Sequence, residues 1–261
     1  MLAICRYSVA GLLLAWFANG VLAQTSVNRD PQAVSVLSQT LNAAGGIKAL
    51  TAVQDFSGTG TVTFYWANQE TGSVTVQGRG ADQFRMDAVL PEGVRSVLVN
   101  DGSGLVIQTD GRVETMTYQG ATNLGNATFP LLEALGQYQN TAISISYVGL
   151  VNHLGNPAHD IRFQLIYPSQ LDPAGLQSAQ TMREIFIDPN TFLPVSILDS
   201  IDTARNTSGL SHEFVFANWQ QVNGIAVPFW ITESVGNQSL VTIQLTQVTF
   251  NTGLSSTAFV P

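Results

Sequence analysis

The segment Gly80–Gly102, GADQFRMDAVLPEGVRSVLVNDG, contains two strand patterns joined by a proline turn. In its first half, apolar Phe84 and Met86 alternate with charged residues, as in a strand that buries one face. A second apolar run follows the proline and ends at Asp101-Gly102, a dipeptide favoured in tight hairpin turns. The segment is therefore expected to form two neighbouring strands of an antiparallel meander.

The same two-residue period extends in both directions along the chain. Upstream, Val62, Phe64 and Trp66 alternate with threonine and tyrosine. Downstream, Asn223-Gly224 joins two such runs and is the strongest hairpin signal in the chain. From residue 143 onward, strands are expected near 143–151, 159–167, 182–188, 193–201, 211–221, 225–233 and 240–251, with a long loop at 168–179.

Helical signals are few. Asp30 is suited to cap a helix that begins at Pro31 and ends at Gly45-Gly46. A short turn is expected at Ile47–Val53, and the leucine spacing of Phe129–Gln139 fits an amphipathic helical segment.

About eleven strands and two or three helices indicate an α+β fold with one large antiparallel sheet. A sheet of this width tends to curl, and its apolar face needs a cover. We therefore expect a curved, half-open sheet with helices over its concave face. No change in composition marks a domain boundary, so residues 24–261 are expected to form a single domain.

The N-terminus has the pattern of an export signal. Arg6 precedes the apolar run Val9–Ala18, which is shorter than the ~20 residues that span a bilayer. Val21-Leu22-Ala23 then predicts removal of residues 1–23 by cleavage after Ala23. The mature protein is expected to be periplasmic or secreted, without a permanent membrane anchor.

Composition excludes several classes of function. Eighteen acidic residues against ten basic ones give a formal charge of −8, which disfavours binding to nucleic acid. The single cysteine, Cys5, lies in the predicted signal, so the mature chain has no disulfide or thiolate chemistry. Nucleotide-binding and hydrolase signature motifs are absent from the sequence, and we expect no cofactor, no metal and no enzymatic activity.

The histidines leave two interpretations open. His153, His159 and Asp160 flank a predicted turn, where they are either metal ligands or ordinary polar turn residues. His212 and Glu213 are adjacent on a strand and should point to opposite faces, with His212 at a solvated or edge position. A hydrolase would require some of these five side chains to converge in a cleft.

The segment Gly80–Gly102 resembles the hallmark stretch of the LolA/LolB-like superfamily, which includes periplasmic chaperones that sort outer-membrane lipoproteins and related lipid-binding proteins. The resemblance rests on a Phe-Arg strand, a proline turn, a further strand and Asp-Gly, here Phe84-Arg85, Pro91, Val97–Val99 and Asp101-Gly102. The opening helix, Phe129-Pro130 and Ala258–Pro261 stand in corresponding places. The resemblance implies a half-barrel in which helices form a lid over an apolar cavity.

The resemblance also implies a site and its partners. The cavity-lining candidates are Val62, Phe64, Trp66, Phe84, Met86, Leu131, Leu132, Leu135, Val227, Phe229 and Ile231. The pattern alone favours an ordinary packed core for these side chains, and only the resemblance makes a cavity lining an equal alternative. Similar chaperones place an Arg-Pro pair before the Phe strand, which makes Arg79, here followed by Gly80, the candidate polar contact to cargo.

Three functions therefore follow from the sequence. The leading one is a non-enzymatic carrier or binding protein for lipid or for the acyl chains of a lipoprotein, with an envelope donor or acceptor protein as a further partner. The first alternative is a cell-envelope interaction or scaffold module without lipid cargo. The second alternative is a hydrolase.

Overall fold

The computed structural model describes residues 27–66, 69–80, 82–117, 120–121, 124, 128–203 and 206–260, without the side chains of 201–203 and 206–208. The predicted signal at residues 1–23 and its cleavage site lie outside the described residues. No helix in the part that is described is long and apolar enough to cross a bilayer.

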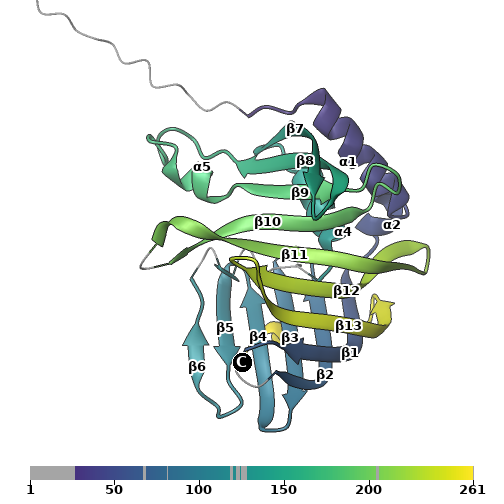
Figure 1. Ribbon diagram of the computed structural model, residues 1–261, viewed down its shortest axis with the longest axis vertical. Coiled ribbons are helices and arrows are strands. Elements are labelled where there is room, and N and C mark those ends of the chain that lie inside the picture. Colours follow the sequence, from purple (N-terminus) through teal and green to yellow (C-terminus); the bar gives the residue numbers. More distant parts are fainter. Residues whose placement is uncertain are drawn as a thin grey trace, which may run out of the picture.

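Thirteen strands form one antiparallel sheet in the order β6-β5-β4-β3-β2-β1-β13-β12-β11-β10-β9-β8-β7 (Figure 1). The strands are β1 (Asp55–Phe64), β2 (Glu70–Arg79), β3 (Gln83–Leu90), β4 (Gly93–Asn100), β5 (Ser103–Ile107), β6 (Val113–Thr115), β7 (Ile143–His153), β8 (Asn156–Leu165), β9 (Arg183–Ile187), β10 (Pro194–Thr203), β11 (Asn206–Val222), β12 (Ile225–Val235) and β13 (Gln238–Phe250). Figure 1 shows β2–β6 running across the direction of β10–β13, so the sheet bends strongly. The predicted curved, half-open α+β sheet is confirmed.

The sheet has two more strands than the sequence predicts. The edge strand β6 explains part of this difference, because it has only three residues and all of them are exposed. A strand without a buried face shows no alternation of apolar and polar residues.

The helices are α1 (Pro31–Ala43), α2 (Ile47–Thr51), α4 (Pro130–Gln139), α5 (Leu176–Gln180) and a final 3-10 turn, η1 (Ser256–Phe259). Three of them, α1, α2 and α4, lie where the sequence predicts helical segments, whereas the sequence does not predict α5 or the final turn. The Asp30 carboxylate caps α1 by accepting from the backbone N–H of Gln32 at 2.7 Å and Ala33 at 3.2 Å. The segment predicted as a loop at 168–179 contains most of the short helix α5.

The hairpin turns at Asn223-Gly224 and Asp101-Gly102 are confirmed. Asn223 and Gly224 have φ angles of 50° and 81°, and Asp101 and Gly102 have 49° and 76°. Both pairs thus use the left-handed conformations that a two-residue turn of type I′ requires.

The β11–β12 hairpin also fixes the end of α1. The N–H of Ala226 donates to the carbonyl oxygen of Ala44 at 3.0 Å. Gly45 has a φ of +117°, and a Cβ at this position would lie 2.3 Å from the carbonyl oxygen of Gly224. Glycine is therefore required here both by the backbone conformation and by the close approach of the hairpin.

The connection between β6 and β7 explains how the concave face is covered. These strands follow each other in sequence but lie at opposite edges of the sheet. The chain between them must cross the concave side, and α4 lies in this crossing, where it contacts α1, α2 and β10. Leucines of α1 and α4, together with inward-facing residues of most strands, form one buried apolar core.

Candidate functional site

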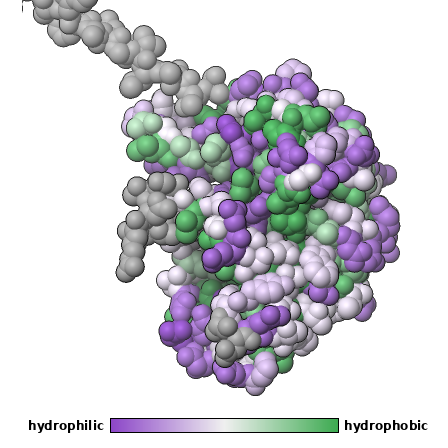
Figure 2. Space-filling view, viewed as in Figure 1, coloured by the Kyte–Doolittle hydropathy of each residue, from purple (hydrophilic) through white to green (hydrophobic). Residues whose placement is uncertain are grey.

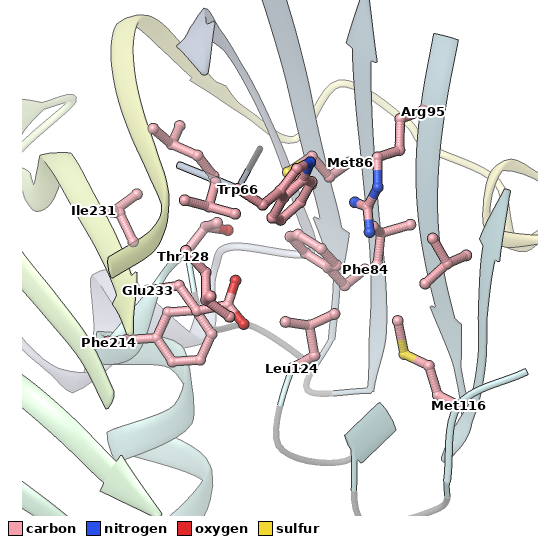
Figure 3. A pocket seen from close by; sticks show the side chains of 15 residues that line it. Trp66, Phe84, Met86, Arg95, Met116, Leu124, Thr128, Phe214, Ile231 and Glu233 are labelled. Carbon is pink, nitrogen blue, oxygen red and sulfur yellow. The ribbon is translucent and has the colours of Figure 1, made fainter. Parts of the chain in front are cut away.

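An apolar cavity of about 170 Å³ lies on the concave side of the sheet (Figure 3). Its walls come from β3, β4, β5 and β11–β13, with contributions from residues that follow β1 and β6. Trp66, Phe84, Met86, Phe214 and Ile231 form much of the apolar lining.

The size of the cavity limits what it can enclose. An engineered apolar cavity of roughly 150 Å³ holds benzene, whereas pockets for drug-sized ligands measure about 300–1,000 Å³. The observed volume of about 170 Å³ therefore fits a short stretch of one hydrocarbon chain. A longer guest would have to extend through the mouth or widen the cavity.

The predicted cavity residues divide into two groups. Trp66, Phe84, Met86 and Ile231 line the cavity. The remaining seven belong to the apolar core or pack against it: Val62, Phe64, Leu131, Leu132, Leu135, Val227 and Phe229. The period of two thus identifies the concave face but does not distinguish a side chain that faces a gap from one covered by a helix.

Arg79 lies elsewhere. It ends β2 and lines an open polar hollow with Asp55, Asp82 and Asp101, among other residues. Its guanidinium donates to Gln83 Oε1 at 3.4 Å. Among the described residues, this hollow and the apolar cavity have no lining residue in common.

The cationic side chain that does line the cavity is Arg95 of β4. Its guanidinium carbon lies 5.3 Å from the ring centre of Phe64 and 5.2 Å from that of Trp66. Its Nε–H donates to Gln108 Oε1 at 3.3 Å. Burial lowers the pKa of Arg95 while the charge of Glu233 opposes this effect, and an arginine remains cationic throughout the physiological range.

Behind the cavity wall, His212 of β11 is buried between two carboxylates. Its Nδ1 lies 2.8 Å from Asp199 Oδ1, and its Nε2 lies 3.1 Å from Glu233 Oε1. Burial acts to lower the pKa of His212, but the hydrogen bonds to Asp199 and Glu233 outweigh it and raise the pKa to about 9. The imidazole is therefore a cation at neutral pH that donates to both carboxylates, and the prediction of a solvated or edge histidine is wrong.

The chain of charges continues to helix α4. Arg183 of β9 lies 3.7 Å from Asp199, measured from Nε to Oδ2, and forms a close ion pair with Glu133 of α4. Burial acts against the charge on Arg183, but Glu133 and Asp199 raise its pKa. Glu133, Arg183, Asp199, His212 and Glu233 thus form a buried charge network that leads from α4 to the cavity wall.

Sequence reasoning missed this network, although a signal was present. His212 precedes inward-facing Phe214 by two residues, and Glu233 follows inward-facing Ile231 by two. A charged residue in phase with buried apolar ones marks either an error in the strand assignment or a buried polar site.

Of the five hydrolase candidates, the structure brings His153 and Glu213 together, but not in the arrangement of a serine-histidine-acid triad. His153 Nε2 lies 2.7 Å from Glu213 Oε1 and 2.8 Å from Ser196 Oγ. A serine-histidine-acid triad instead places the acid and the serine on opposite ring nitrogens. Ser196 is also fully buried, so its hydroxyl is not accessible to a substrate.

His159 and Asp160 take part in other contacts. His159 Nδ1 bonds to the hydroxyl of Tyr147 at 2.9 Å, and burial, followed by the charge of Glu184, raises the pKa of Asp160 to about 6. Within the described residues, no group of three or more His, Cys, Asp or Glu side chains is placed to hold a metal ion. The two predicted turn-flanking histidines thus contact different partners.

Comparison with known proteins bears on the fold. No family model matches the sequence, and no curated protein matches it either. The LolA superfamily protein NE2245 from Nitrosomonas europaea superposes with a TM-score of 0.55 at 10% identity, over 88% of this chain and 97% of that one. The chain has the LolA-type fold. A domain from Vibrio parahaemolyticus, named for outer membrane lipoprotein sorting, gives a TM-score of 0.51 at 11% identity over 87% of this chain and 96% of that one.

These likenesses confirm the resemblance first suggested by Gly80–Gly102 at the level of the fold. At a sequence identity of 10–11%, these likenesses support a shared LolA-type backbone fold and do not extend to function. Any statement about cargo must therefore rest on the side chains of this chain.

Proposed function

We propose that this protein is a non-enzymatic carrier or binding protein for a lipid or for the acyl chain of a lipoprotein. It would act in the periplasm as a single domain, residues 24–261, after removal of the N-terminal signal. A donor or acceptor protein of the cell envelope would complete the transfer. The observation that carries the proposal is the apolar cavity on the concave side of the half-open sheet.

The energetics of acyl transfer fit such a cavity. Each methylene moved from water into an apolar site contributes ~0.8 kcal/mol, so even a short buried stretch of chain gives useful binding. Met86 and Met116 both line the cavity. Methionine side chains are unbranched and polarizable, which lets them adapt to guests of irregular shape.

Substitutions that fill the cavity test the proposal. Ile243 lines the cavity, while the next residue of β13, Gln244, is exposed on the other face. We expect Ile243→Trp to weaken binding of a fluorescent fatty acid, and Gln244→Trp to bind it as the unmodified protein does. Mass spectrometry of gently purified protein should also detect co-purifying lipid. Absence of both lipid and probe binding in the unmodified protein would contradict the proposal.

A second candidate is a protein-interaction module of the envelope. Val148, Leu150 and Leu154 of the β7–β8 hairpin are 46, 59 and 54% exposed, and Figure 2 shows hydrophobic side chains gathered over this part of the surface. Exposed apolar clusters often mark contact sites for other proteins. If this surface were the functional one, Leu150→Ser with Leu154→Ser would abolish crosslinking to envelope proteins, while Ile243→Trp would leave it unchanged.

A further inference from the structure

We propose that the cavity selects a single-chain amphiphile with an anionic oxygen head group, and that Arg95 and Thr128 hold that head. This inference rests on the proposed function, since it specifies which guest the apolar cavity takes. It rests on the polar groups that line the cavity, because binding of a purely apolar guest would not require them.

Arg95 provides a cation that is held in place before a ligand arrives. The rings of Phe64 and Trp66, at 5.3 and 5.2 Å from its guanidinium carbon, position the group by cation–π contact. Figure 3 shows the guanidinium directed toward the cavity. One of its five N–H groups is bonded to Gln108, and no ion pair within 4 Å involves Arg95 in the described part of the chain.

Glu233 lines the same cavity but is already paired. Its Oε1 lies 3.1 Å from Nε2 of His212, whose imidazole is cationic at neutral pH. Glu233 is thus the terminal carboxylate of the buried charge network. Arg95 has aromatic rings and an amide as its near neighbours, and the charges of Glu233 and Glu114 act on it from beyond 4 Å. The N–H groups of Arg95 that remain unbonded to any described residue at the cavity therefore favour a ligand that carries a hydrogen-bond acceptor.

Thr128 supplies a second and independent indication. It is 4% exposed, lines the cavity, and its hydroxyl has no hydrogen-bond partner among the described residues. Figure 3 shows this hydroxyl directed into the cavity. Buried polar atoms in native proteins are almost always paired, so a ligand oxygen would complete this site.

The chemistry of these groups specifies the ligand class. An arginine fork matches the two oxygens of a carboxylate or phosphate, and a threonine hydroxyl adds a third bond. The remaining lining is largely apolar, and a volume of about 170 Å³ leaves room for one chain rather than several. A fatty acid and a single-chain phospholipid both have this chemistry.

A ligand series with one chain and four head groups tests the inference. Decanoate, decyl phosphate, 1-decanol and decyltrimethylammonium are titrated into the full mature protein, with tryptophan fluorescence and calorimetry as readouts. We expect at least one of the two anions to bind about tenfold tighter than decanol, the effect of one charge-assisted hydrogen bond. The stronger of the two anions identifies a carboxylate or a phosphate source.

Substitutions of Arg95 test whether this residue causes the preference for anionic head groups. Arg95→Gln should reduce the affinity ratio of anion to alcohol to about one, and Arg95→Lys should retain part of it because a point charge replaces the fork. Arg79→Gln, in the separate polar hollow, should leave the ratio unchanged. Equal binding of all four compounds, or a preference for the ammonium compound, would overturn this inference and leave the carrier proposal intact. Binding of none of them would contradict the carrier proposal itself.

Discussion

Arg183 of β9 and Glu133 of α4 form a buried ion pair that attaches the helix crossing the concave face to the sheet. Their side chains are only 9% and 12% exposed. The pair therefore adds an ionic contact to the apolar packing between α4 and the sheet.

Removal of one partner should be costly. Glu133→Gln removes the close carboxylate partner of Arg183 and leaves Asp199 at 3.7 Å as an ionic neighbour, and loss of a partner from a buried pair costs about 3 kcal/mol. Urea unfolding monitored by fluorescence should show this loss in the free energy of unfolding. The matched control is Glu114→Gln, whose pair with Arg112 has side chains 47% and 67% exposed, and which should cost less than ~1 kcal/mol. Equal effects of the two variants would show that the buried pair has no special role.

The stability of the protein should fall at mildly alkaline pH because of His212. Its pKa is about 9 in the folded state, against about 6.5 for an unperturbed histidine. A raised folded-state pKa gives stability that is fully present below pH ~6.5 and is lost as the pH rises through about 9.

The expected loss over this interval is on the order of 3 kcal/mol. Unfolding free energies measured from pH 6 to 10 should decline in the unmodified protein and show a smaller slope in His212→Gln. His159→Gln is the control histidine, because its ring bonds to a tyrosine hydroxyl rather than to two carboxylates. A His212→Gln profile parallel to that of the unmodified protein would contradict the assigned role.

Alanine substitutions at two adjacent glycines allow the effect of backbone strain on stability to be distinguished from that of steric contact. Gly45 and Gly46 both have positive φ angles, +117° and +92°, but only a Cβ on Gly45 would meet another atom, the carbonyl oxygen of Gly224 at 2.3 Å. Gly46→Ala should destabilise the protein by about 1 kcal/mol through strain alone. Gly45→Ala should cost more, because it also displaces the β11–β12 hairpin. Thermal unfolding of the two variants measures the difference, and a less stable Gly46→Ala would contradict it.

Local signals explain which parts of the fold could be predicted. Asn223-Gly224 forms its hairpin because the dihedral angles of two residues decide the turn, and Asp30 caps α1 through contacts within three residues. Neither feature depends on the rest of the molecule. The curved sheet could be predicted for a related reason, since each strand carries its own alternation.

The site depends on long-range packing, which the sequence pattern does not contain. Phe64 and Trp66 occupy equivalent phases of one strand pattern, yet Phe64 is fully buried and Trp66 is 39% exposed at the cavity. The ring of Phe64 contacts Trp66, with ring centres 4.4 Å apart, and the guanidinium of Arg95, whereas Trp66 itself follows the last residue of β1. Likewise, Asp199 meets His212 because the β10–β11 register pairs them directly, and that register is set by the whole hairpin.

The absence of pairing between β6 and β7, the two edge strands of the described sheet, has a mechanical consequence. Spreading these two edges apart breaks no backbone hydrogen bonds between them. A fully closed barrel would have to rupture a ladder of hydrogen bonds to enlarge its interior. Under the carrier proposal, the interior can therefore be enlarged for a wider guest without breaking a hydrogen-bonded ladder between the two edges.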